Sequence, residues 1–130
     1  MRQLICSGIL FCVILGMAHI SSCSYDQYAP EEEPVVTDSV SFADDILPIF
    51  NAACNTAGCH NSAGVSPDLS PGNAYEALIS GGFINVSNPD DSELLQWMRG
   101  NRDLDMPLEG PDPEYNALVL AWITQGAVNN

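Results

Sequence analysis

Two cysteines and one histidine stand within seven consecutive positions, Cys54 to His60, and they constrain the fold more than any other feature. The other three cysteines and the other histidine of the chain all lie within the first 23 residues. Beyond these first residues the sequence predicts a folded domain of about 90 residues. At this size a hydrophobic core alone gives only marginal stability. A cross-link or a bound cofactor would help such a domain to fold, and Cys54, Cys59 and His60 are the residues from which either could be built.

The first 22 residues predict a cleaved export signal. Arg2 is followed by an uncharged apolar run from Leu4 to Ile20, and then by two serines and Cys23. The segment Ile20-Ser21-Ser22-Cys23 resembles the bacterial lipobox, which implies that Cys23 is acylated and becomes the new N-terminus. An ordinary signal peptide and a membrane span are the alternatives, but the run is short for a span and no basic residues follow it. Acyl chains would attach the protein to a membrane without crossing it.

The chain is strongly acidic, with a formal charge of −14 and no lysine. Beyond Arg2, its only basic residues are Arg99 and Arg102. This balance excludes nucleic-acid binding, because the phosphate backbone would be repelled. We expect a partner protein with a basic docking surface, although the acidity could equally serve solubility.

The composition divides the chain into three parts. We expect a signal peptide over residues 1–22, a lipid anchor with an acidic flexible tether over 23–39, and a folded domain over 40–130. The segment from Ser24 to Ser39 is polar and acidic with two prolines and shows no helical or strand periodicity.

The apolar pattern of the domain predicts an all-α fold of about four helices with long loops. The helix start signals are Ser41, Ser70-Pro71, Asn88-Pro89 and Asp112-Pro113. The corresponding stop signals in the later helices are Gly81, Gly100 and Gly126. Pro48 is expected to kink or divide the first helix. Residues 61–69 and 101–111 are rich in Gly, Pro, Asn and Asp, which predicts loops.

The cysteine and histidine segment has two interpretations that involve no haem. One is a disulfide between Cys54 and Cys59, and the other is a zinc site made by both thiolates and His60. A disulfide across so short a loop stabilises little and leaves His60 without a role. Zinc would lack an obvious fourth ligand, because His19 leaves with the signal.

The segment Cys54-Asn55-Thr56-Ala57-Gly58-Cys59-His60 resembles the haem-attachment signature of c-type cytochromes, whose usual form is C-x-x-C-H. Here four residues separate the cysteines, so the extra residues must loop out of a regular helical turn. Asn55 and Gly58 tolerate the turn conformations that this requires. The resemblance implies one covalently bound haem c, with thioether bonds from Cys54 and Cys59 and with His60 as an axial ligand of the iron.

The same resemblance implies a second axial ligand, which is commonly methionine. His60 is the only histidine beyond residue 23, so a second histidine within the molecule is excluded. Met106 precedes Pro107 in the loop before the last predicted helix, where small cytochromes c commonly carry this ligand. Met98 follows Trp97 in a predicted helix and suits a core position. We therefore expect His60 and Met106 to bind the haem iron.

From about Phe42 to Ala127 the order of elements resembles a monohaem cytochrome c. This implies a cytochrome c-like fold in which Phe42, Ile46 and Phe50 pack near Leu118 and Trp122. The expected function is that of a membrane-anchored carrier of single electrons on the periplasmic or cell-surface side of a bacterial membrane, more an electron carrier than a catalyst and with no catalytic residues. The alternatives are a haem enzyme in which Met106 leaves the iron open, and a haem-free structural or binding lipoprotein with a disulfide.

Overall fold

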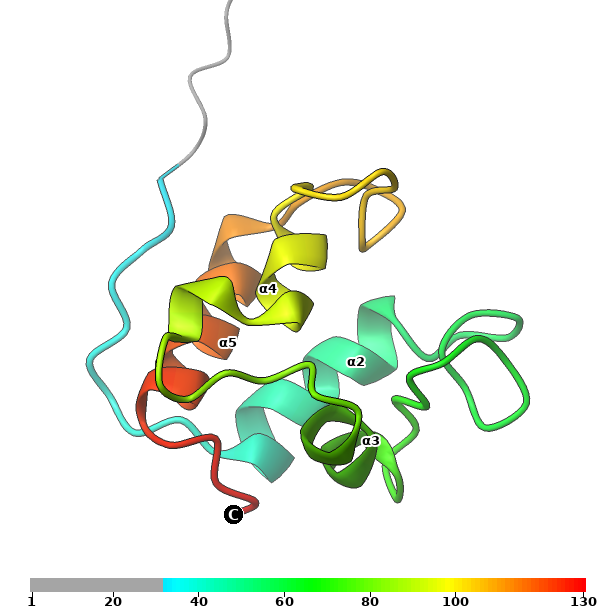
Figure 1. Cartoon of the computed structure of the whole chain (residues 1–130), viewed down its shortest axis with the longest axis horizontal. Helices are drawn as coiled ribbons and strands as arrows, with labels where there is room; N and C mark the ends of the chain where they lie inside the picture. Colours follow the sequence, from blue (N-terminus) through cyan, green and yellow to red (C-terminus); the bar gives the residue numbers. More distant parts are fainter. Residues whose placement is uncertain (1–31) are drawn as a thin grey trace, which may run out of the picture. The chain divides into compact units, whose positions relative to one another are not determined.

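The computed structural model describes residues 32–130, and all regular structure within them is helical (Figure 1). No strand occurs in this range, so the predicted all-α class is confirmed. The predicted signal peptide, Cys23 and the first part of the predicted tether lie outside the described residues. No helix in the described range is long and apolar enough to span a membrane.

The first predicted helix is divided at the proline, as expected. A π-helix, η2, runs over Phe42–Ile46 and the α-helix α2 continues over Leu47–Ala53. Pro48 stands in the first turn of α2, next to the junction with η2, where its ring supplies no N–H to the helical hydrogen bonds. Ser41 caps η2, because its hydroxyl accepts a hydrogen bond from the Asp44 amide at 3.2 Å.

The second helix, α3, spans Ala74–Ser80 and begins later than the predicted start at Ser70. The amides of Asn73 and Ala74 both donate to the Ser70 carbonyl. Residues 70–73 therefore form a turn before the helix. The Ser70 hydroxyl donates to Asp68 at 2.5 Å and does not cap the helix. Asp68 thus orders this turn, and the prediction from Ser70-Pro71 was wrong at this boundary.

The third predicted helix consists of two short pieces. The 3₁₀-helix η3 covers Pro89–Asp91 and α4 covers Glu93–Met98. Ser92 separates them with an extended backbone and is fully buried, and its hydroxyl accepts a hydrogen bond from the Asn85 amide at 2.9 Å. Asn85 lies seven positions earlier and outside the helix, so the helical pattern of the sequence gives no sign of this bond.

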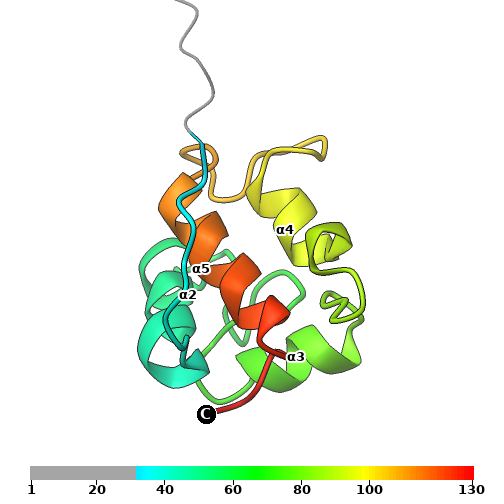
Figure 2. The same cartoon turned by 90° about the vertical axis from the view of Figure 1, so that its left-hand side faces the viewer.

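The last helix, α5, spans Pro113–Thr124 as predicted. Asp112 caps it by accepting hydrogen bonds from the amides of Glu114 and Tyr115 at 2.9 and 3.0 Å. In Figure 2, α5 runs between α4 and the η2–α2 segment. It therefore forms the central element of the fold.

An aromatic cluster joins the two ends of the domain. The ring centroids of Phe42 and Trp122 lie 5.2 Å apart, which confirms the predicted contact between the first and last helices. Tyr75 of α3 lies 5.3 Å from Phe42, and its hydroxyl donates to the Ala127 carbonyl. Such pairs add to the free energy of burying the rings.

The end of the predicted tether lies against the domain. Arg99 donates two hydrogen bonds of 2.6 Å to the Glu33 carboxylate. The Gln125 side chain binds the amide of Val40 and the carbonyl of Asp38, and Val40 is buried. Residues 33–40 are therefore a strap on the folded domain.

Candidate functional site

The two cysteines and the histidine lie in one loop that begins where α2 ends. Cys54 is the residue after α2, and its amide donates to the Phe50 carbonyl at 2.9 Å. The chain then turns at Gly58, whose φ of 85° suits glycine. The His60 amide donates back to the Cys54 carbonyl at 3.0 Å, so the loop closes on itself and brings the second cysteine and the histidine back to the end of α2.

The hydrogen bonds of the half-buried His60 ring favour one tautomer of the neutral imidazole. Its Nδ1 lies 3.1 Å from the Val65 carbonyl oxygen and 3.2 Å from the Pro67 carbonyl oxygen. Both partners only accept hydrogen bonds, so Nδ1 must carry the proton in the neutral ring. Nε2 then holds a free lone pair, and no hydrogen bond engages it within residues 32–130. This is the tautomer that a metal-binding imidazole needs, with its other nitrogen fixed by a carbonyl.

Both thiols are half-buried and free. Burial, together with the neighbouring Cys59, raises the pKa of Cys54 from 9.0 to about 11, so this group is a neutral thiol at physiological pH. The Thr56 hydroxyl donates to the sulfur of Cys59 at 3.3 Å. The two thiols are therefore held as neighbours on either side of the Asn55–Gly58 turn.

Met106 lies on a second loop, which connects α4 to α5. Its side chain is half-buried and the following Pro107 is buried, while Met98 is 3% exposed within the core cluster. The core position expected for Met98 is thus confirmed. No hydrogen bond in the described range connects the Met106 loop to the His60 loop.

The two alternatives without haem gain no support from these side chains. Cys54 and Cys59 do not form a disulfide. No group of three or more His, Cys, Asp and Glu side chains converges as a metal site anywhere in residues 32–130, and zinc would require one. A haem iron needs only one or two protein ligands, and an imidazole nitrogen with a free lone pair meets the first requirement.

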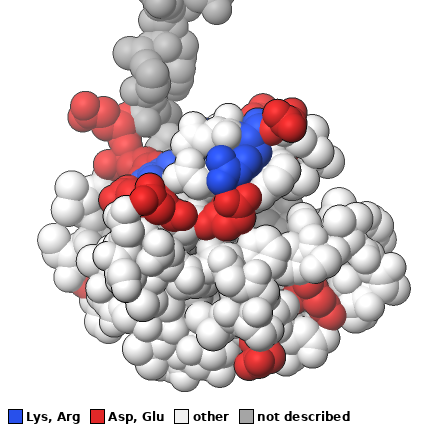
Figure 3. Space-filling model, viewed as in Figure 1, with Lys and Arg blue, Asp and Glu red and all other residues white. Residues whose placement is uncertain are grey.

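Charge is distributed unevenly on the face of the molecule that Figure 3 shows. Figure 3 shows most of the charged side chains in the upper part of the view, over α4 and the loop that follows it. Arg99 pairs with Glu33 and Asp90, and Arg102 pairs with Glu93. Both basic residues of this part of the chain are therefore neutralised within the molecule. In the His60 loop, Asp68 is the only acidic residue between Cys54 and Leu69.

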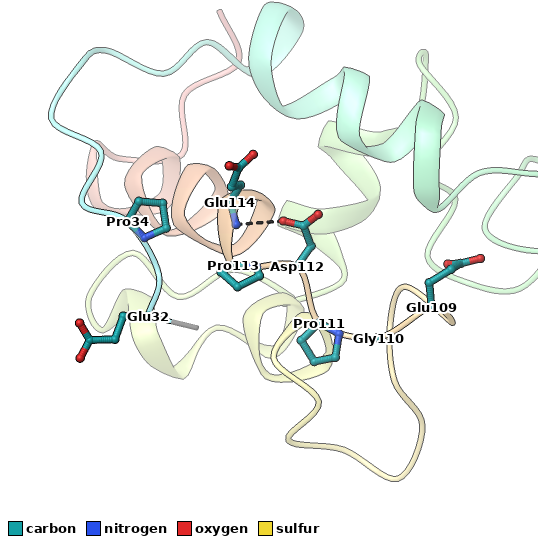
Figure 4. A pocket seen from close by; sticks show the side chains of 8 residues that line it. All are labelled: Glu32, Pro34, Glu109, Gly110, Pro111, Asp112, Pro113 and Glu114. Atoms are coloured by element: carbon teal, nitrogen blue, oxygen red, sulfur yellow. Dashed lines mark hydrogen bonds between the residues drawn. The ribbon is translucent and has the colours of Figure 1, made fainter. Parts of the chain in front are cut away.

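A separate hollow lies where the strap passes the start of α5 (Figure 4). Its lining is acidic and proline-rich and consists of Glu32, Pro34, Glu109, Gly110, Pro111, Asp112, Pro113 and Glu114. Asp112 already has a role there as the cap of α5. None of the four predicted haem-binding residues lines this hollow, so it is not their site.

Sequence reasoning did not find the two residues that fix the His60 ring. Val65 and Pro67 act through backbone carbonyls, so their side chains carry no sign of the role. It also missed the pairing of Arg99 with Glu33, which lie 66 positions apart. The only local signal was the Gly64 to Pro67 segment, which predicts a turn and no more.

Comparison with known proteins identifies no relative of this chain. No protein-family model, curated protein or solved structure gives a significant match to the chain. The predictions of a cytochrome c-like fold, a haem and a lipid anchor therefore rest on the residues of this chain alone.

Proposed function

We propose that this chain is an exported, lipid-anchored c-type cytochrome with a cytochrome c-like fold, which carries single electrons through one covalently bound haem c. The observation that carries the proposal is the state of His60. Two carbonyls hold its ring at Nδ1, and Nε2 is free. His60 directly follows Cys59, and the thiols of Cys59 and Cys54 are both free. Histidines that bind a metal commonly show this combination, with one ring nitrogen held by a hydrogen bond and the other free.

Four residues would hold the haem in this proposal. Cys54 and Cys59 would form the thioether bonds, His60 would bind the iron through Nε2, and Met106 would bind it through sulfur. When bound, the haem supplies a one-electron Fe(III)/Fe(II) couple. The role of the chain is to fix both ligands so that the iron keeps its coordination as its charge changes, and a histidine and methionine pair raises the reduction potential.

Both loops carry exposed apolar side chains that a bound haem could contact. Val65 is 61% exposed on the His60 loop, while Leu104 and Leu108 are 52% and 63% exposed on the Met106 loop. Each leaves apolar surface in water at a cost of about 25 cal/mol per Å². A haem between the two loops would cover such surface.

The electrostatics favour a basic redox partner. With Arg99 and Arg102 neutralised by Glu33, Asp90 and Glu93, the described surface offers other proteins an excess of negative charge. Such a field speeds encounter with a positively charged protein surface. The same field disfavours nucleic acid.

The strap limits how far the domain can stand from the membrane. Glu33 lies ten positions after Cys23 (33 − 23), and an extended residue spans at most about 3.6 Å. If Cys23 is acylated, the point where the strap joins the domain lies within roughly 36 Å of the anchor. The pair of Glu33 with Arg99 would thus keep the carrier close to partners in the same membrane.

Optical spectroscopy of the purified full chain tests the proposal. We expect a low-spin haem spectrum in both oxidation states, which Met106→Ala converts to a high-spin one. Met98→Leu serves as the matched control and should leave the spectrum unchanged, because Met98 belongs to the core. A spectrum that Met106→Ala does not alter would point to the open-site haem enzyme, and a protein without haem absorption would refute the cytochrome.

A further inference from the structure

The loop after His60 has no room for a side chain at position 64. A Cβ atom on Gly64 would lie 1.8 Å from the Cys59 carbonyl oxygen and 3.0 Å from the Cys59 carbonyl carbon. It would also lie 2.8 Å from Oδ1 of Asn61. The first two neighbours are backbone atoms, so a larger residue would have to move the peptide that links Cys59 to His60.

Gly64 also stands beside the residue that closes the loop around His60. The Val65 amide donates to the Cys59 carbonyl at 2.9 Å, and the Val65 carbonyl accepts the hydrogen bond from His60 Nδ1 at 3.1 Å. Gly64 and Val65 therefore fix both the position of the Cys59–His60 peptide and the position of a carbonyl that accepts from the His60 ring. A displacement of the backbone at position 64 would therefore move the imidazole through the Cys59–His60 peptide and through the Val65 carbonyl.

We propose that Gly64 is a positioning residue that sets the orientation of the His60 imidazole toward the haem iron. The proposal rests on the proposed haem function and adds a residue to it. Gly64 has no need of a left-handed backbone, so its role is steric. Gly72, in the turn before α3, has nothing within 4 Å of its Cβ position and also lies outside the left-handed region. It is the matched control.

The test is proton NMR of the oxidised, haem-loaded full chain, because the shifted haem methyl resonances report the orientation of the axial ligands. We expect Gly64→Ala to rearrange these resonances and to shift the reduction potential, while Gly72→Ala changes neither. Ile123→Val is the control for a loss of stability alone, because it weakens the core at a fully buried position of α5. If Ile123→Val rearranges the resonances as much as Gly64→Ala, or if Gly64→Ala leaves them unchanged, the proposal is wrong.

A second variant covers the case in which Gly64→Ala yields no haem-loaded protein. Asn61→Ala removes the hydrogen bonds of the Asn61 side chain to the Ala63 amide and the Thr56 carbonyl without adding atoms. We expect it to move the same resonances by less, and unchanged resonances would overturn the proposal.

The wild-type protein separates this proposal from the haem function itself. If the wild type carries no haem, the haem function has failed, and ¹⁵N NMR of the His60 ring in the haem-free chain becomes the readout. The wild type should then show the Nδ1-protonated tautomer and Gly64→Ala a mixture of tautomers. The same tautomer in both would refute the positioning role.

Discussion

The loop of residues 54–69 and the loop of residues 99–111 carry the two proposed iron ligands, but they are held in different ways. The first closes on itself around His60, through the amides of His60, Val65 and Leu69 and through the imidazole ring. In the second, backbone hydrogen bonds occur near its ends, such as that from the Gly110 amide to the Pro107 carbonyl, and none involves Met106. The hydrogen bonds of its own loop thus position His60, whereas no backbone hydrogen bond positions Met106, which is half-buried.

The two loops also differ in charge. The His60 loop contains one charged residue, Asp68, while the Met106 loop contains two arginines and three acidic residues, so the two loops differ in the number of charged side chains. A hydrogen-bonded loop with few charges suits attachment of an apolar cofactor. A charged loop with few internal bonds suits adjustment of a ligand and contact with a partner.

The largest expected contrast is between the two methionines in the haem-free chain. Met98→Ala should lower the free energy of unfolding by about 2–5 kcal/mol, because it opens a cavity in the core. Met106→Ala should lower it by less than about 1 kcal/mol, since its loop contributes little to the fold. Urea unfolding followed by circular dichroism measures both, and equal losses would show that the Met106 loop is part of the core.

The reactivity of the Cys54 thiol tests whether the start of the His60 loop is closed to solvent. Burial raises the pKa of Cys54 to about 11, so at pH 8 its thiolate population should be about 100-fold below that of a thiol with the ordinary value of 9.0. Alkylation of Cys54 in the haem-free chain should be slower by a similar factor in the folded state than in urea. Peptide mass mapping after timed alkylation measures this, and equal rates would mean that the end of α2 is open.

Hydrogen exchange compares the two loops directly. The amides of Val65 and Leu69 donate to the carbonyls of Cys59 and His60 at 2.9 and 2.7 Å, so they should exchange on the order of tenfold or more slowly than unprotected amides. The amides of Asp103 and Leu104 make no such bonds in the described structure and should exchange near their intrinsic rates. Equal protection in the two loops would remove the distinction.

The smallest effect concerns two aspartates. Asp68→Ala removes hydrogen bonds from the Ser70 amide, the Ser70 hydroxyl and the Asn73 side chain, so it should lower the urea midpoint slightly at neutral pH. The Ser70 hydroxyl bond is the main cause that lowers the pKa of Asp68 below 3.8. This contribution to stability is therefore present above pH 3.8 and fades as the pH falls through the lower pKa of the folded state.

Asp103→Ala is the control for that measurement. Asp103 is exposed and accepts no hydrogen bond in the described structure, so the variant should unfold at the wild-type midpoint. If Asp68→Ala remains destabilised at a pH well below 3.8, where wild-type Asp68 is itself protonated, the hydrogen bonds do not depend on its charge.

Local sequence rules predicted those parts of the fold that depend on neighbouring residues. Ser41, Pro48 and Asp112 behave as their caps and ring geometry require, because each acts within one helical turn. The start of α3 was missed because the Ser70 hydroxyl binds Asp68. The break at Ser92 was missed because its partner is Asn85, seven positions earlier in a loop.

The candidate site was predictable by residue type and not by geometry. Cys54, Cys59, His60 and Met106 carry chemistry in their side chains, so a motif can indicate them. Backbone carbonyls orient His60, and close backbone packing restricts position 64 to glycine. Neither feature has a side chain that a motif could record.

The central claim is that the chain binds haem covalently through the Cys54–His60 segment. The most direct measurement is a pyridine haemochrome assay on the purified full chain, combined with its intact mass. We expect one haem c for each chain, retained after denaturation and acid extraction. A mass equal to that of the haem-free chain, with no haemochrome spectrum, would contradict the claim.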